Sequence, residues 1–358
     1  MNELVSLTKK FVKENILEPA VEHDEHDTYP QDIVDGMKEL GFFGLTISEE
    51  YGGLGLDKLT YVRIIEELAK GWASVPGLLN SHLIVAYLIE KFGTLEHKGL
   101  LPQLATGESR GAILLTEPSA GSDLKSIQTS VRHGKLSGQK TMITNGRVAT
   151  LLAVLAKNGD AISIYLVPSD REGITIGPNM KKMGFKGIET VDIYFEDVHV
   201  SDDDLIGESG KGISSFLHAL EFGRLSIAAS ALGVAEAAYE SSIAYAKERI
   251  VYGKPISELQ TVQMHLAKMY SQIKATRILT HHIATTTENL DLDSSVAKYY
   301  ASETAVEVTQ TALRVFGGYG YMKEYPIERY IRDATMYLVG EGANDALLTS
   351  IAKKILKG

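Results

Sequence analysis

The spacing of apolar residues predicts helices at both ends of the chain. In the first 110 residues, Ile33, Met37 and Leu40 recur at the three- and four-residue spacing that places side chains on one helix face. The same spacing returns after residue 210 and continues over lengths that suit a bundle of helices. The long C-terminal helices are predicted over residues 212–249, 257–290 and 294–316.

Between the helical regions the pattern changes to short apolar runs and alternation. Residues 190–200 alternate with period two, which places Val191, Ile193 and Phe195 on one side of a predicted strand. Short connections between such runs favour a β unit over a βαβ array. Further strands are predicted within residues 112–115, 131–143, 161–167 and 174–176.

These patterns divide the chain into three predicted domains. Residues 1–111 are expected to form a helical domain, residues 112–210 a central β domain and residues 211–358 a helical domain. The predicted fold class is therefore α+β.

One carboxylate occupies a distinctive place in this pattern. Glu341 lies between Gly340 and Gly342, at a break between two predicted amphipathic helices, and Asn344 is expected to cap the second helix. The glycines permit a tight turn and leave room for a ligand to approach. A carboxylate that loses water between buried helices becomes a stronger base. Taken alone, the stretch also fits a solvated loop glutamate beside a glycine that ends a helix.

Composition excludes several classes of function. Lys and Arg number 36 against 46 Asp and Glu, and the resulting net charge of −10 argues against a general nucleic-acid surface. A local basic pocket for a phosphorylated small molecule remains compatible with that charge. The chain has no cysteine, which rules out disulfides and thiolate chemistry. The longest apolar run, around residues 148–156, is too short to span a bilayer, so we expect a cytoplasmic protein without a membrane segment.

Three stretches resemble familiar motifs but lack the features those motifs need. Residues 207–212 lack phosphate-loop spacing and carry Gly212 where Ser or Thr is required. Residues 318–320 lack the preceding strand and the third glycine of a dinucleotide fingerprint. Residues 23–27 contain His and Asp in a polar stretch expected between helices, with no second ligand cluster, so no metal site is predicted.

Four separated segments together resemble the acyl-CoA dehydrogenase family of flavoproteins. Their order and spacing match the family over nearly the whole chain. The segments are Leu-Thr-Glu-Pro-Ser-Ala-Gly-Ser-Asp at 115–123, Gly-Gln-Lys-Thr-Met-Ile-Thr-Asn-Gly at 138–146, Arg-Ile-Val-Tyr-Gly-Lys-Pro-Ile at 249–256, and Phe-Gly-Gly-Tyr-Gly-Tyr at 316–321 leading to Glu-Gly at 341–342.

The resemblance implies a central β-barrel-like domain and a C-terminal four-helix bundle, with noncovalent FAD between them. It also implies that a neighbouring subunit supplies part of each FAD site, in a homotetramer or homodimer. Acyl-CoA would be the substrate, and an electron-transferring flavoprotein would be the acceptor.

The resemblance also assigns residues to the two ends of the cofactor. Thr116 and Thr144 would hydrogen-bond the isoalloxazine, with Met142 and Ile143 beside it, and Ser122 would touch the substrate's pantetheine arm. The residues expected at the pyrophosphate and adenosine end are Arg249, Tyr252, Gln260, Arg314, Gly317 and Gly318. The residues alone leave structural alternatives open: a helix-end arginine for Arg249 and an ordinary helix end at the glycine pair.

By the same resemblance, Glu341 would remove the α-proton of an acyl thioester while the β-hydride passes to the flavin. Gly342, Glu221 and Arg224 would lie near the substrate, although a surface pair is an equal alternative for Glu221. Some branches of the family carry the base immediately before an arginine on an earlier helix. Here that position is Gly223, so Glu341 is left as the candidate base.

The chain departs from the family pattern at four positions. Met142 replaces a usual aromatic residue, Arg314 a common Gln, Gly340 a frequent Tyr and Ala343 a usual Thr. We expect Gly340 to widen the acyl pocket. Three other functions remain open: an acyl-CoA oxidase, a dehydrogenase of carrier-protein-bound acyl groups, and a family member that binds nucleic acid.

Overall fold

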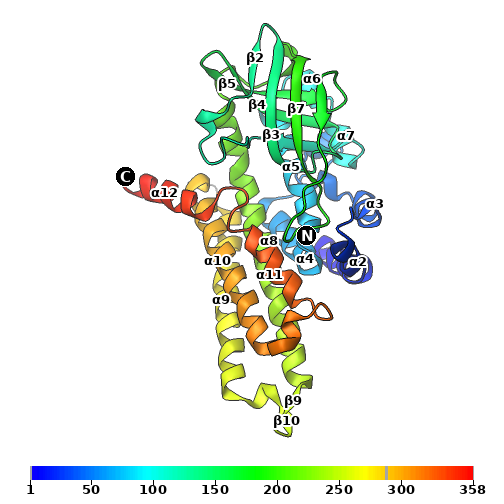
Figure 1. Ribbon diagram of the computed structural model, residues 1–358, viewed down its shortest axis with the longest axis vertical. Helices are drawn as coiled ribbons and strands as arrows, with labels where there is room; N and C mark the ends of the chain where they lie inside the picture. The colour runs from blue at the N-terminus through cyan, green and yellow to red at the C-terminus, as the bar shows by residue number, and fades with distance from the viewer. Residues whose placement is uncertain (1, 287–288, 358) are drawn as a thin grey trace.

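The computed structural model describes residues 2–286 and 289–357 and confirms the predicted α+β class. Figure 1 shows the β domain at one end of the molecule, a long helical bundle at the other, and the N-terminal helices beside their junction. The N-terminal helices are α1 (Asn2–Phe11), α2 (Pro19–His26), α3 (Gln31–Glu39), α4 (Lys58–Gly71), α5 (Ser74–Phe92), α6 (Leu95–Lys98) and α7 (Leu101–Thr106).

The central region forms one eight-stranded sheet. Its strand order is β6-β7-β3-β2-β4-β5-β8, and β1 pairs in parallel with β4 beside this path. The strands are β1 (Gly111–Leu114), β2 (Ser130–Arg132), β3 (Lys135–Thr144), β4 (Leu151–Asn158), β5 (Ala161–Pro168), β6 (Ile174–Ile176), β7 (Thr190–His199) and β8 (Leu205–Ile206).

Strand β7 alternates as the sequence predicts, whereas β4 does not show alternation. Val191, Ile193 and Phe195 are buried, and Tyr194 between them is exposed. In β4, the first six residues are all buried, because the strand is covered on both faces. This run of residues was not predicted as a strand, since a continuous apolar run carries no period.

The C-terminal region contains three long helices and two short ones. They are α8 (Gly212–Glu248), α9 (Gln260–Thr285), α10 (Leu290–Phe316), α11 (Ile327–Met336) and α12 (Asn344–Ile355), with a small hairpin of β9 (Ile250–Val251) and β10 (Lys254–Pro255) after α8. Residues 287 and 288 of the predicted second long segment lie outside the described residues. Helix α8 is rich in buried small residues and packs against α10, α4 and α5, so it joins the bundle to the N-terminal helices.

Three local predictions need correction. His23 and His26 lie within α2 and not between helices, and no group of three or more metal-binding side chains occurs in the described part of the chain. Asn344 begins α12 as its first residue and does not cap it, because its side chain is buried in other contacts. The apolar positions of α12 are largely uncovered, with Leu348 and Ile355 exposed.

The described helices include none that is long and apolar enough to cross a membrane. The predicted cytoplasmic location stays a prediction.

Candidate active site

Glu341 lies in the loop between α11 and α12, in a left-handed backbone conformation. Its φ is 51°, and the following Gly342 has a φ of 96°. Left-handed backbone is unfavourable for a residue with a Cβ, so surrounding contacts must hold Glu341 in place. Such strained positions cluster at functional sites, and Glu341 is one of them by its backbone conformation.

The two oxygens of the Glu341 carboxylate have different surroundings. Asn80 of α5 donates from Nδ2 to Oε1 across 3.0 Å. The other oxygen, Oε2, is buried and has no hydrogen-bond partner among the described residues. One oxygen is thus held in place, and the other is free to accept a proton.

Burial raises the pKa of Glu341. The positive charges of Arg224 and Lys298 and the hydrogen bond from Asn80 oppose that increase. A carboxylate with a raised pKa is a stronger base when ionised, and the opposing positive charges favour the ionised form. These electrostatics suit a general base.

The predicted alternative position for a base, Gly223, lies beside this carboxylate. A Cβ added to Gly223 would lie 3.2 Å from Glu341 Oε2 and 2.8 Å from Ile84 Cδ1. Gly223 and the Glu341 carboxylate, which are 118 residues apart in the sequence, therefore lie next to each other in the structure. Next to it, the rings of Phe222 and Tyr61 stack at 4.5 Å between centroids.

The space beside Gly340 is occupied. A Cβ there would lie 2.5 Å from the sulfur of Met336, so the Met336 side chain fills the volume that a larger residue would enter. This contact does not support our expectation that Gly340 widens the acyl pocket.

The two predicted substrate residues on α8 make their own contacts. Arg224 is buried and donates to Asp291 Oδ1 at 2.9 Å and Ser295 Oγ at 3.2 Å, both on α10. Its Nε is buried without a partner among the described residues. Glu221 is half-buried and lies 3.4 Å from His218 Nδ1.

The predicted flavin segments are joined at the edge of the sheet. The Thr141 N–H donates to the Thr116 carbonyl at 2.9 Å, which connects the loop after β1 to β3. Lys140 is fully buried and donates to Glu117 Oε1 at 2.9 Å and to the Leu115 carbonyl at 3.1 Å. Sequence reasoning missed the structural role of this buried pair, although both residues fall within the matched segments.

Met142 and Ile143 face opposite ways at the end of β3. The pairing of β3 with β7 shifts register between Lys140 and Ile143, and Met142 there has a φ of 55°. The bulge leaves Met142 exposed and Ile143 buried. Thr144, the last residue of β3, is half-buried, and Ser122 is exposed in the loop after β1.

Helix α5 connects the end of β3 to Glu341. Asn145, next to Thr144, donates from Nδ2 to the Leu78 carbonyl at 3.3 Å. Asn80, two residues further along α5, donates to Glu341. Thr144 and Glu341 are therefore held by points within one turn of the same helix, and Oδ1 of Asn145 is a buried acceptor without a partner in the described chain.

The second predicted group lies at the hairpin end of the bundle. The Arg249 guanidinium is 5.2 Å from the centre of the Tyr319 ring. Added Cβ atoms at Gly317 and Gly318 would meet nothing within 4 Å, and Gly317 has a φ of 62°. Space therefore remains beside these glycines. Tyr252 is 90% exposed, and Gln260 and Arg314 are also exposed.

The two groups of predicted cofactor residues are far apart within one chain. Gly223, beside Glu341, and Arg249 are separated by 26 residues along α8 and its end, or about 39 Å at 1.5 Å per residue. The residues predicted for the two ends of the cofactor therefore lie toward opposite ends of α8 within one chain.

Three domain profiles of one family match the chain in order. The acyl-CoA dehydrogenase N-terminal domain matches residues 2–108, the middle domain 112–198 and the C-terminal domain 210–356. A 3-(aryl)acrylate reductase from Clostridium sporogenes is 36% identical and is aligned over 99% of this chain and 98% of its own length. The chain belongs to the acyl-CoA dehydrogenase family.

Solved structures of similar proteins have the same fold. Butyryl-CoA dehydrogenase from Megasphaera elsdenii matches with a TM-score of 0.96 and 34% identity, covering 99% of this chain and 97% of that one. A chain in a structure described as "Electron transferring flavoprotein of Acidaminococcus fermentans: Towards a mechanism of flavin-based electron bifurcation" also has a TM-score of 0.96 and 34% identity, covering 100% and 98%. The protein is thus an oxidoreductase of this family, and its cofactor is FAD.

Proposed function

We propose that this chain catalyses the α,β-dehydrogenation of an acyl-CoA thioester to the trans-2-enoyl thioester, with Glu341 as the base. The observation that carries the proposal is the Glu341 carboxylate. One oxygen is held by Asn80, the other is buried without a partner in the described chain, and burial raises its pKa. This is the state expected of a group that removes a weakly acidic proton from carbon.

The residues at the sheet edge fit the flavin end of FAD. The Thr141–Thr116 hydrogen bond brings together the two segments that carry Thr116 and Thr144, whose hydroxyls can donate to or accept from a flavin ring edge. Exposed Met142 offers a polarisable side chain to a flat ring. When bound, FAD supplies the hydride acceptor for the reaction. Glu341 takes the α-proton, and its backbone N–H is suited to donate to the thioester carbonyl as negative charge develops there.

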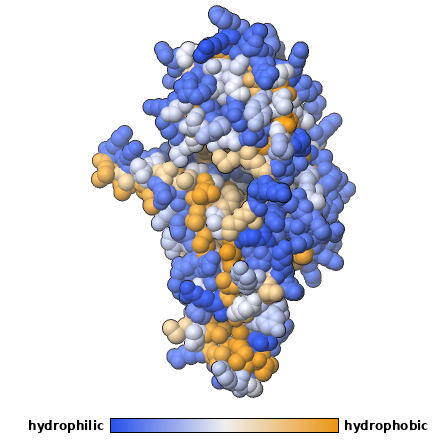
Figure 2. All heavy atoms as spheres, in the orientation of Figure 1, coloured by the Kyte–Doolittle hydropathy of each residue, from blue (hydrophilic) through white to orange (hydrophobic). Residues whose placement is uncertain are grey.

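The other end of FAD would be held by a second copy of the chain. The separation of about 39 Å along α8 favours Arg249 of a neighbouring copy over Arg249 of the same chain, and a guanidinium suits paired phosphate oxygens. Figure 2 shows apolar side chains along the projecting α12 and over the hairpin end of the bundle. Exposed apolar residues there include Ile250, Tyr252, Tyr319, Met322, Leu348 and Ile355. Uncovered apolar surface of this kind is typical of a subunit interface, and it supports a homodimer or homotetramer.

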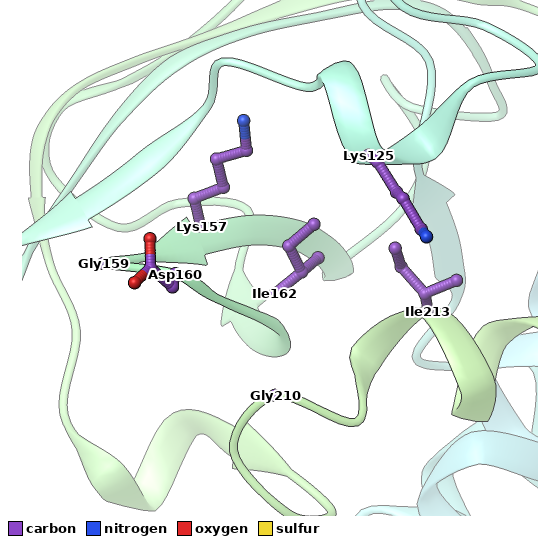
Figure 3. A pocket seen from close by; sticks show the side chains of 7 residues that line it. All are labelled: Lys125, Lys157, Gly159, Asp160, Ile162, Gly210 and Ile213. Carbon is purple, nitrogen blue, oxygen red and sulfur yellow. The ribbon is translucent and has the colours of Figure 1, made fainter.

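A basic pocket could receive the phosphate end of CoA. It has a volume of about 420 Å³ and lies where the β4–β5 turn meets the start of α8. Figure 3 shows Lys157 and Lys125 on opposite sides, with Ile162 between them; Asp160 is the acidic residue of the lining, which leaves the two lysines in excess. Ile213, also in its lining, is ten residues before Gly223 on α8, or about 15 Å along the helix. An extended pantetheine arm spans a similar distance, so the two lysines lie where a phosphate at the end of that arm would reach.

An anaerobic spectrum tests the proposal. Purified yellow protein should lose its flavin absorbance when an acyl-CoA of suitable length is added, and a panel of graded acyl chains identifies the substrate. Rapid peroxide formation in air would indicate an oxidase. Absence of bleaching with every acyl-CoA, together with bleaching by acylated carrier protein, would indicate the carrier-linked dehydrogenase. Retention on DNA without any bleaching would indicate a nucleic-acid-binding member of the family.

The similarity to a 3-(aryl)acrylate reductase favours testing the reverse reaction as well. The same groups could reduce an enoyl thioester, with Glu341 returning a proton to the α-carbon. Reoxidation of the reduced protein by an enoyl-CoA would detect this activity. An electron-transferring flavoprotein is the proposed redox partner in either direction, supported by the similarity to the Acidaminococcus chain.

A further inference from the structure

A buried lysine holds the loop that carries Glu341. Lys298 on α10 has no exposed surface, and its Nζ donates to the Gly342 carbonyl at 2.6 Å and to Asn344 Oδ1 at 2.8 Å. Asn344 in turn donates from Nδ2 to Glu303 Oε1 at 2.8 Å. The loop after Glu341 is therefore fastened to α10 through one ammonium group.

The rest of the loop is also fixed. On the side before Glu341, the Gly340 N–H donates to the Met336 carbonyl at 2.9 Å. Asn80 holds the Glu341 side chain from α5. Lys298 supplies the contact on the remaining side, where Glu341 and Gly342 both have positive φ. A strained loop persists only when its surroundings hold it, so removing one contact should let it relax.

Charged groups face Glu341 from two of the helices around it. Arg224 from α8 and Lys298 from α10 both lower its pKa, and Glu341 in turn raises the pKa of Tyr61 on α4. Burial lowers the pKa of Lys298 to about 8, against the opposing effects of Glu341 and Glu303. Lys298 is thus close to the point at which its own charge is lost in mildly alkaline solution.

We propose that Lys298 is a positioning residue for Glu341, which holds the catalytic loop through Gly342 and Asn344 and keeps a positive charge beside the base. The inference rests on the proposed function, in which Glu341 removes the α-proton. It adds that a lysine 43 residues before the base in the sequence holds the base in position and favours its ionised form.

This proposal determines the shape of the pH–rate profile. Activity requires ionised Glu341, which gives an acid limb, and full activity also needs protonated Lys298, which gives an alkaline limb near pH 8. Because the two groups interact, both limbs belong to the pair and should move together in variants. Loss of the lysine charge should move the midpoint of the acid limb to higher pH by about one unit and abolish the alkaline limb.

The test compares Lys298→Met with Lys298→Gln, measured as the FAD-loaded protein. Both variants lose the charge, but Gln keeps a donor for the Gly342 carbonyl. We expect kcat to fall about tenfold or more in Lys298→Met, with a smaller change in KM, and to recover partly in Lys298→Gln at high pH. Lys268→Met is the matched control. Lys268 lies on α9 and pairs with Glu307, which is on α10 like Lys298, but the Lys268 side chain is exposed. It should leave both limbs unchanged.

A readout without turnover separates this inference from the proposed function. Carbon NMR of the glutamate carboxyl groups, compared with Glu341→Gln, follows the ionisation of Glu341 in unliganded protein. Its midpoint should rise in both Lys298 variants even if no thioester is ever a substrate. If neither Lys298 variant folds, Asn344→Ala retains the charge and removes one contact. It should lower kcat severalfold and leave the acid limb in place.

An unchanged Glu341 midpoint in a folded Lys298 variant would overturn the inference. So would wild-type kcat with both limbs intact in Lys298→Met, or, in the absence of folded Lys298 variants, wild-type kcat in Asn344→Ala. Failure of the wild-type protein to bleach with any thioester would instead count against the proposed function alone.

Discussion

Asn80 donates a hydrogen bond to Glu341 across 3.0 Å, and the two residues are 261 positions apart in the sequence. The contact joins α5, beside the sheet, to the last loop of the helical bundle. Since the Asn80 amide donates, it stabilises the ionised carboxylate and not the protonated one. The N-terminal helices therefore contribute directly to the chemistry of a C-terminal residue.

Replacing Asn80 with Leu should move the acid limb of activity to higher pH. Without the donor, the pKa of Glu341 rises further above its ordinary value, so less of the base is ionised at neutral pH. We expect a shift of about one pH unit, because a hydrogen bond to a charged group contributes about 1.5–3 kcal/mol. A pH series of flavin bleaching rates measures it. An unmoved acid limb in folded, FAD-loaded Asn80→Leu would contradict the role given to this contact.

The sequence indicates Glu341 as the candidate base but not the residues that hold it. The flanking glycines and the change in helical period mark the loop locally, and both features can be read directly from the sequence. Asn80 and Lys298 come from separate helices and follow no period that points to Glu341. Both look in the sequence like ordinary polar positions within an apolar helix, and only the packing of α5 and α10 around the loop reveals their roles.

In the fold, too, some elements could be predicted from local sequence patterns and others could not. The three long helices and the alternating strand β7 were predicted because their periods are distinct. Strand β4 was missed because burial on both faces removes alternation. The exposed apolar face of α12 was expected to be buried, since a sequence does not say whether its own chain or a second copy covers a helix.

Moving the carboxylate from Glu341 to Gly223 should preserve part of the activity. Glu341→Gln should bind FAD and lose roughly 10²–10⁴-fold in rate, because it removes the base. In the double variant Glu341→Gly with Gly223→Glu, the new side chain starts 3.2 Å from the former position of Oε2. We expect activity well above that of Glu341→Gln, with altered chain-length preference because Ile84 must shift. Activity no higher than that of Glu341→Gln in a folded double variant would show that the two positions are not interchangeable.

Asp333 should make the protein less stable as pH rises toward neutrality. Burial raises its pKa from 3.8 to about 7, and its Oδ1 accepts from the Phe185 N–H at 2.7 Å while Oδ2 has no partner in the described chain. The folded state thus holds the proton more tightly than the unfolded state. The stabilisation is complete below about pH 3.8 and is lost as pH rises through about 7.

Asp333→Asn is the corresponding variant. It should keep the contact with Phe185 and avoid the buried charge, so it should be more stable than wild type at pH 8 by about 4 kcal/mol. The difference should shrink toward pH 4.5 in thermal unfolding. Asp197→Asn, at an exposed aspartate, is the control and should show no such pH dependence in this window. Equal stability of Asp333→Asn and wild type at pH 8 would contradict the prediction.

Lys125→Ala and Lys157→Ala should weaken binding of acyl-CoA through its phosphates. We expect each to raise KM severalfold with little change in kcat, more strongly at low salt. A truncated acyl thioester of N-acetylcysteamine lacks the nucleotide and should be unaffected. Lys135→Ala serves as the control, since Lys135 pairs with Asp197 outside this pocket. An equal loss with both substrates would place the effect elsewhere than on the phosphate end.

Mixing two inactive variants should restore activity if two copies share each FAD site. Glu341→Gln removes the base, and Arg249→Ala weakens the group about 39 Å away along α8. In a mixed dimer, one site combines both defects and the other has neither. Random reassortment of equal amounts gives one-half mixed dimers, so about one-quarter of wild-type activity should return. Mixing either variant with itself, taken through the same dissociation and reassembly, is the control. If the mixture stays as inactive as its parents while reassembled wild type is active, Arg249 does not act on a neighbour's site, and the division of the FAD site between two copies is wrong.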